Sequence, residues 1–239
     1  MSGDHPIASN LAAVRRRVEG AVRAAGRSPT DVRLVAVSKT FPLEDVRAAA
    51  AAGQRDFGEN RVQEALPKID GGADLRVRWH LIGHLQSNKA RRAVTAFQCI
   101  HSIDSLDLLQ RVDRAAADAG AAPDLLIQVD LAAEPTKFGL PEPFVRPLFD
   151  VPLRAARLRG LMILPPLADN PEEARPWFRR LRELRDRLEA DGVPAANLQE
   201  LSMGMSHDFE VAIQEGSTMV RVGTAIFGRR SDAGAENRQ

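Results

Sequence analysis

The chain has 239 residues, of which 44% are hydrophobic and 27% charged, and its formal net charge at pH 7 is +1. These values are typical of a soluble globular protein, and the small net charge with only 5% aromatic residues argues against binding of nucleic acid or an anionic membrane. The single cysteine, Cys99, allows no intrachain disulfide and suits a reducing compartment, so we expect a cytoplasmic protein. The opening residues "MSGDHPIASN" lack the basic flank and apolar run of a signal peptide.

Short apolar runs alternate with helical patterns along the chain. After a helical segment within residues 1–30, strands are expected at 32–39, 55–60, 78–83, 99–104, 124–132, 158–164, 198–204 and 218–228. Helices are expected at 43–53, 61–69, 88–97, 105–120, weakly within 142–150, from Asn170 onward and at 207–216. Strand–helix alternation predicts a parallel sheet.

Eight strand–helix units in this length predict an α/β fold of the (β/α)8 TIM-barrel type, and a doubly wound open sheet is the alternative. We expect residues 1–230 to form one domain, because no long linker interrupts them. The polar tail 231–239 is expected to be disordered.

Lys39 ends the first predicted strand, "VRLVAVSK". Four of the 33 basic residues are lysines, so the other 29 are arginines, and a lysine in this position invites a chemical explanation. A primary amine can form a Schiff base with a carbonyl compound, which a guanidinium cannot do at working pH. The structural alternative is a salt-bridge partner.

The last two strands predict a phosphate site on the same barrel mouth. Active sites of such barrels lie at the carboxyl ends of the strands, and phosphate is often bound by the loops after strands seven and eight. The segments "LSMGMS" and "RVGTAIFG" supply hydroxyls, small residues and backbone N–H groups there. An amine opposite a phosphate cradle suits a phosphorylated aldehyde, and pyridoxal 5′-phosphate (PLP) is the obvious candidate.

Arg221 shares a strand face with Gly223, so we expect it to meet the pyridine nitrogen and keep that nitrogen unprotonated.

Several motifs resemble the pyridoxal phosphate homeostasis proteins (the YggS/PROSC type). They are "AVSKT", "FGENRVQEA", "WHLIGHLQSNK", "HSID" and, most specifically, "LSMGMSHDFEVAIQEGSTMVRVGTAIFGRR". The resemblance runs from about residue 32 to residue 230. It implies a barrel related to the N-terminal domain of alanine racemase that holds PLP as a Schiff base and carries or buffers it without catalysis. Apo forms of PLP-dependent enzymes are the implied recipients, and we expect a monomer.

The predicted cofactor-binding residues follow from the residue pattern and this resemblance. They are Lys39, Asn60, His84, Ser202, Met203, Ser206, Arg221, Gly223 and Thr224. Ser206 could equally be a helix N-cap, and the roles of Glu59 and Lys137 stay open. No metal site is expected.

A PLP-dependent racemase or decarboxylase and a Schiff-base aldolase that uses Lys39 without PLP are the enzymatic alternatives. The resemblance implies that racemase chemistry would need a tyrosine base opposite the lysine, and the chain contains no tyrosine.

Overall fold

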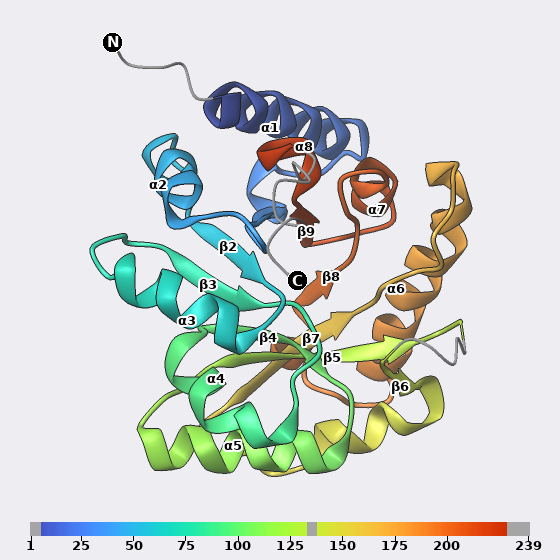
Figure 1. Ribbon diagram of the computed structural model, residues 1–239. Helices are drawn as coiled ribbons and strands as arrows, with labels where there is room; N and C mark the ends of the chain where they lie inside the picture. Colours follow the sequence, from blue (N-terminus) through green and yellow to red (C-terminus); the bar gives the residue numbers. More distant parts are fainter. Residues whose placement is uncertain (1–5, 133–137, 229–239) are drawn as a thin grey trace, which may run out of the picture.

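Eight parallel strands close into a barrel in the computed structural model, which describes residues 6–132 and 138–228 (Figure 1). Around the ring they are β1 (Arg33–Val37), β2 (Asp56–Glu59), β3 (Arg78–Leu81), β4 (Cys99–Ile103), β5 (Asp124–Asp130), β7 (Arg157–Met162), β8 (Glu200–Ser202) and β9 (Met219–Val222). β9 pairs with β1 and β4 pairs with β5, so the ring has no open edge. The two-residue strand β6 (Leu140–Pro141) adds to the outer part of β5. The predicted (β/α)8 barrel is therefore confirmed.

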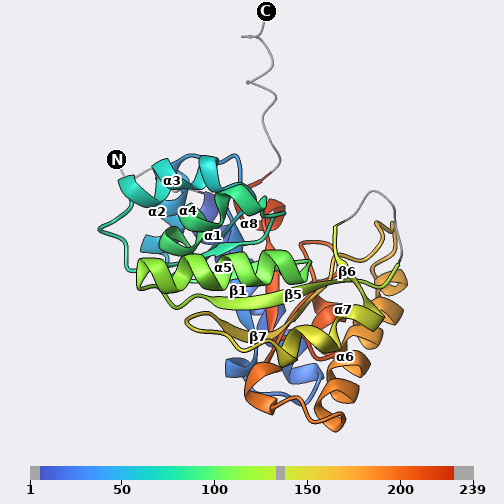
Figure 2. The same cartoon turned by 90° about the horizontal axis from the view of Figure 1, so that it is seen from below.

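Helices surround the strands, as Figures 1 and 2 show from two directions. They are α1 (Pro6–Ala24), α2 (Leu43–Ala51), α3 (Val62–Gly71), α4 (Ala90–Ala96), α5 (Leu106–Ala119), α6 (Arg175–Ala190), α7 (Phe209–Gln214) and α8 (Thr224–Phe227). The N-terminal helix α1 packs against α2, α7 and α8, and so joins the first and last parts of the described chain. No helix among the described residues is both long and apolar enough to cross a lipid bilayer.

Three details differ from the sequence-based expectation. The weak helix within 142–150 is a pair of 3-10 turns, Glu142–Phe144 and Arg146–Asp150, because prolines interrupt the segment. Asn170 caps a 3-10 turn, and α6 follows from Arg175. The end of the predicted last strand is the short helix α8. Lys137 and the tail 231–239 lie outside the described residues.

Apolar side chains form two separate clusters. The large one fills the layer between strands and helices, where α6 contributes four buried side chains at helical spacing, namely Phe178, Leu181, Leu184 and Leu188. The small one contains Cys99, Leu126, Met162 and Met219. These four belong to four different strands of the ring, so they lie within the barrel, whose remaining interior includes several buried polar side chains.

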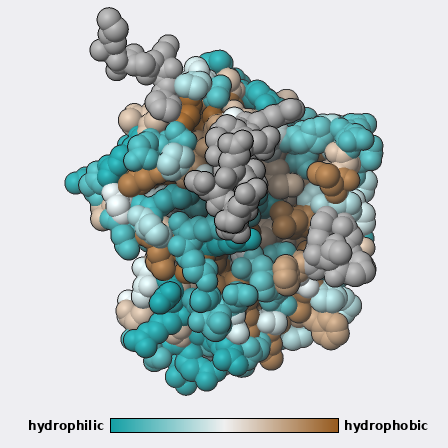
Figure 3. All heavy atoms as spheres, viewed as in Figure 1, coloured by the Kyte–Doolittle hydropathy of each residue, from teal (hydrophilic) through white to brown (hydrophobic). Residues whose placement is uncertain are grey.

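Hydrophilic residues dominate the face in Figure 3, and the hydrophobic residues on it form small separate patches. The monomeric state stays a prediction.

Candidate functional site

A tight turn directly after β1 places Lys39 at the barrel mouth. Ser38 N donates to Gly58 O at 3.0 Å and Phe41 N donates to Ser38 O at 3.1 Å, which holds both ends of the turn. Thr40 has φ +68°, a left-handed conformation that a β-branched residue rarely adopts. Such strain is concentrated at functional sites. Lys39 is half-buried, and its amine forms no hydrogen bond or ion pair with any residue in the described ranges.

A buried ion pair supports this turn from behind. Lys68 Nζ, from α3, donates to Ser38 O at 2.8 Å and to Glu59 Oε1 at 2.7 Å. Ser38 Oγ donates to the same Glu59 oxygen at 2.7 Å. Glu59 is fully buried, and within the described chain its Oε2 has no hydrogen-bond partner. The role of Glu59, left open by the sequence, is thus to pair with a lysine behind the Lys39 turn.

Two backbone N–H groups converge beside that turn. Ser206 Oγ accepts from Gly223 N at 3.2 Å and from Ala225 N at 3.4 Å. A Cβ added to Gly223 would lie 3.2 Å from Val37 O, so the glycine packs directly against the end of β1. Because Lys39 follows Val37 by two residues, the lysine and the converging N–H groups lie at the same end of two neighbouring strands. We call these groups the cradle, a candidate phosphate site that consists of Ser206, Gly223, Thr224 and Ala225.

A ring contact ties the Lys39 loop to the cradle. Thr224 is the exposed first residue of α8, and Phe227 closes that helix. The Phe227 ring stacks on Phe41 with the centroids 5.2 Å apart. The structure therefore brings together Lys39, Ser206, Gly223 and Thr224 from the predicted set.

Ser202 and Met203, two further predicted cofactor-binding residues, are both buried. Ser202 is fully buried in the barrel interior, where its Oγ accepts from Arg221 Nη1 at 2.6 Å. Met203 is fully buried in the core beneath the helices. Successive strand residues point to opposite faces, so these two lie below the rim and on opposite sides of the sheet. The Ser206 hydroxyl contacts the cradle N–H groups, and binding of the cofactor by Ser202 and Met203 stays a prediction.

Arg221 lies directly below the cradle. It is 3% exposed, and its Nη2 donates to Ile163 O at 2.9 Å. Burial lowers the pKa of Arg221 to about 10, although the charge of Asp208 acts to raise it. The guanidinium is therefore still cationic at neutral pH and is fixed by two neutral oxygens, those of Ile163 and Ser202.

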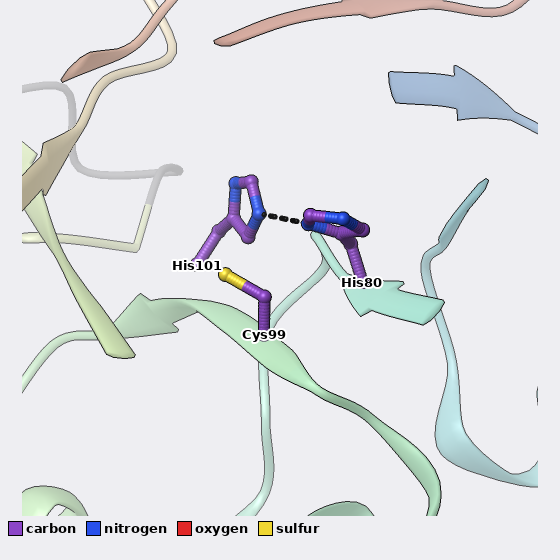
Figure 4. A group of neighbouring side chains, drawn as sticks. All are labelled: His80, Cys99 and His101. Carbon is purple, nitrogen blue, oxygen red and sulfur yellow. Dashed lines mark hydrogen bonds between the residues drawn. The ribbon is translucent and has the colours of Figure 1, made fainter. Parts of the chain in front are cut away.

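Two buried histidines continue the polar contacts into the barrel (Figure 4). His101 Nδ1 lies 2.8 Å from Ser202 Oγ, and His101 Nε2 lies 2.9 Å from His80 Nδ1. His80 Nε2 lies 2.9 Å from Asp56 Oδ1. The Cys99 sulfur is close enough for the three residues to resemble a metal-binding group. However, all four ring nitrogens are already engaged in these hydrogen bonds, so this arrangement offers no free ring nitrogen to a metal ion.

Asn60 and His84 lie on another part of the rim, after β2 and β3. The two chain segments are in close contact, since a Cβ added to Gly83 would clash with the carbonyl oxygen of Asn60. His84 Nδ1 is 3.1 Å from Asp104 Oδ2, and its ring stacks on Phe138 at 3.6 Å. An open pocket of about 550 Å³ is lined by residues 60–64, 83–86 and Lys89. Asn60 and His84 share this pocket, which lies beside the Lys39 turn and does not include it.

The buried histidines predict a loss of stability in acid. Burial lowers the pKa of His80 and lowers that of His101 further, so the unfolded chain takes up protons at these positions before the folded one does. The stability that depends on these neutral histidines is therefore fully present above about pH 6.5, the ordinary pKa of histidine. It falls as the pH drops below that value. For each histidine, the free energy of unfolding falls by at most about 1.4 kcal/mol per pH unit. Urea unfolding at pH 5.5, 6.5 and 7.5 measures this; equal stability at all three pH values would contradict the prediction.

The groups at the mouth fit a phosphorylated aldehyde. An amine without a partner among the described residues suits the carbonyl carbon. Converging backbone N–H groups suit a phosphate, and a cationic guanidinium suits a ring nitrogen that accepts a hydrogen bond. Sequence reasoning missed the histidine pair, because His80 and His101 meet only when β3 and β4 pair side by side in the barrel.

Comparison with known proteins gives the family and the fold relatives of the chain. The family model described as "Alanine racemase, N-terminal domain" matches residues 9–231. The pyridoxal phosphate homeostasis protein of Pseudomonas aeruginosa is 46% identical over 232 residues, which cover 96% of this chain and 97% of that protein. The PipY protein of Synechococcus elongatus, solved with PLP bound, has a TM-score of 0.82 and 42% identity, covering 93% of this chain and all of that one. An alanine racemase of Clostridium difficile, at 16% identity and a TM-score of 0.68, shares the fold.

The closed parallel barrel and the family-model match place the chain in the class of alanine racemase N-terminal domains. Within that class, the chain belongs to the family of pyridoxal phosphate homeostasis proteins.

Proposed function

We propose that this protein binds PLP as a Schiff base on Lys39 and carries or buffers it, without catalysing a reaction of its own. The observation that carries the proposal is the Lys39 amine, which has no hydrogen-bond or ion-pair partner within the described residues. It follows β1, the strand paired with β9, and the converging N–H groups of Gly223 and Ala225 follow β9. The relatives named pyridoxal phosphate homeostasis protein and the PLP-bound PipY structure support it.

Each residue has a defined task in this proposal. Lys39 holds the aldehyde carbon, and the cradle with its Ser206 and Thr224 hydroxyls holds the phosphate. Arg221 donates to the pyridine nitrogen, and Asn60 lies beside the ring. PLP, when bound, supplies an aldehyde that captures amines and a ring that can withdraw electrons from them.

Two features favour a carrier over an enzyme. Arg221 is cationic at neutral pH and cannot protonate the pyridine nitrogen, which leaves the ring a weaker electron acceptor. The chain also has no tyrosine that could serve as a second base. Amino-acid racemisation is the alternative function, and the shared barrel fold is the observation that favours it.

Absorption spectroscopy and a transfer assay test the proposal together. Adding PLP should give a band near ~420 nm, typical of a Schiff base to this cofactor, whereas pyridoxal without phosphate should bind far more weakly because the cradle has no anion to hold. PLP-loaded protein is then mixed with an apo PLP-dependent enzyme, either directly or across a dialysis membrane. Faster activation in the mixed sample indicates direct handover. Turnover of added amino acids would instead support the racemase alternative.

Arg221→Glu should shift the absorption band of bound PLP. A carboxylate at this position would stabilise a protonated pyridine nitrogen, which changes the electronic state of the ring. The exposed residue Arg61 provides the control, since Arg61→Glu makes the same charge change outside the barrel. If the spectra of both variants match that of the wild type, Arg221 does not face the pyridine nitrogen.

We further propose that apo PLP-dependent enzymes receive the cofactor and that the protein works in the cytoplasm as a monomer. Its single, fully buried cysteine suits that reducing compartment.

A further inference from the structure

The barrel interior contains a continuous line of polar side chains. The line, here called the interior relay, consists of Arg221, Ser202, His101, His80 and Asp56. The four hydrogen bonds between successive members are 2.6, 2.8, 2.9 and 2.9 Å long. Asp56 is the first residue of β2, whereas Ser202 is the last residue of β8, so the relay runs from beneath the mouth to the opposite end of the barrel.

Such a line is unusual, because apolar side chains normally fill the interior of this fold. Burying polar groups lowers stability unless each is hydrogen-bonded, and well-packed apolar residues of similar volume are often at least as stable. His80, His101 and Ser202 are fully inaccessible to solvent, and both ring nitrogens of each histidine have partners. Complete satisfaction of a buried network points to a requirement for one defined arrangement.

The chemistry of the two ends fixes the direction of every hydrogen bond. Arginine can only donate and an ionised aspartate can only accept. Arg221 therefore donates to Ser202, Ser202 donates to His101 Nδ1, His101 Nε2–H donates to His80 Nδ1, and His80 Nε2–H donates to Asp56. Each histidine then carries one proton, on Nε2, and is neutral.

The charged surroundings favour the same protonation state. Arg33 lies 3.8 Å from Asp56 and also pairs with Glu200 at 3.3 Å, while Arg78 pairs with Asp124. Burial is the largest cause that lowers the pKa of both histidines, and the positive charges of Arg33 and Arg78 act in the same direction. The contact with Asp56 raises the pKa of His80 but is outweighed, so both rings stay neutral near pH 7.

We infer that His101, His80 and Asp56 are positioning residues for bound PLP: through the interior relay they fix the orientation of Arg221 beneath the pyridine ring. This inference rests on the proposed function, in which Arg221 meets the ring nitrogen. Ser202 Oγ accepts from Nη1 of Arg221 because its own proton is committed to His101, and His101 can accept that proton because its other nitrogen donates to His80. Breaking the relay at His101 frees the Ser202 hydroxyl to turn and loosens the guanidinium.

The first arm of the test uses the protein without PLP. Long-range ¹H–¹⁵N NMR of histidine-labelled protein reports the protonated nitrogen of each ring. We expect two neutral histidines with Nε2–H that do not titrate between pH 6 and 8, one of which disappears in His101→Leu. An Nδ1–H tautomer or an imidazolium at either position would overturn the relay, and the wild-type spectrum alone decides this.

The second arm uses PLP-loaded protein. His101→Leu should still trap PLP on Lys39, but with a displaced absorption maximum and a shift of about one pH unit in the pH midpoint of its absorbance. Asp56→Asn, which keeps an acceptor oxygen but removes the charge, should give a smaller shift in the same direction. Ser102→Ala is the matched control, since Ser102 is equally buried and its Oγ has no partner in the described chain.

The two arms separate the inference from the proposed function. Wild-type protein that traps PLP on Lys39, together with a His101→Leu spectrum identical to that of the wild type, would overturn the inference alone. Wild-type protein that does not trap PLP on Lys39 would overturn the proposed function and the positioning role with it.

Discussion

Lys39→Ala should abolish covalent PLP binding. The band near ~420 nm should disappear, and borohydride should leave no pyridoxyl group on the variant, because alanine lacks the amine with which the aldehyde condenses. The fold should persist, since the half-buried Lys39 side chain makes no hydrogen bond or ion pair within the described residues. Absorption spectra before and after borohydride, with circular dichroism for the fold, measure both effects.

Lys89→Ala serves as the control for this variant. Lys89 lines the neighbouring pocket shared by Asn60 and His84, so its removal tests whether any nearby lysine suffices. It should leave the absorption band unchanged. Undiminished trapping in Lys39→Ala would show that another amine holds the aldehyde.

Lys68→Met should destabilise the protein by about 3–5 kcal/mol, the usual cost of leaving one member of a buried ion pair without its partner. The Lys68 side chain is 12% exposed and that of Glu59 is fully buried, so the remaining carboxylate gains little solvation. Ser38 O also loses a donor, which should loosen the Lys39 turn and slow the capture of PLP. Urea unfolding measures the stability, and the growth of the absorption band measures the capture.

A double variant separates charge from packing at this position. Adding Glu59→Gln to Lys68→Met removes the uncompensated charge while keeping the hydrogen-bonding capacity of the side chain, and should recover most of the lost stability. If Lys68→Met lowered the free energy of unfolding by less than about 1 kcal/mol, solvent would be screening the Lys68–Glu59 pair, as it does for surface ion pairs.

The sequence predicted the barrel because local patterns specify it. Strand–helix alternation and apolar periodicity predicted all eight barrel strands, and Lys39 and Gly223 followed from their places at strand ends. The two-residue strand β6 was missed because so short a pairing depends on a neighbouring strand rather than on its own sequence.

The parts of the site that the sequence could not predict depend on side-chain pairing across the fold. His80 and His101 are 21 residues apart, and Ser202 follows His101 by another 101, so no local pattern connects them. The burial of Ser202 follows from strand alternation, but its choice of Arg221 and His101 as partners requires the register of the closed barrel. Likewise, Glu59 and Lys68 pair because α3 folds back over β2.

Peptide mapping of the borohydride-reduced, PLP-loaded protein tests the central claim most directly. The account predicts one pyridoxyl group per chain, carried by the peptide that contains Lys39. A pyridoxyl group found mainly on Lys68, Lys89 or Lys137 would contradict it.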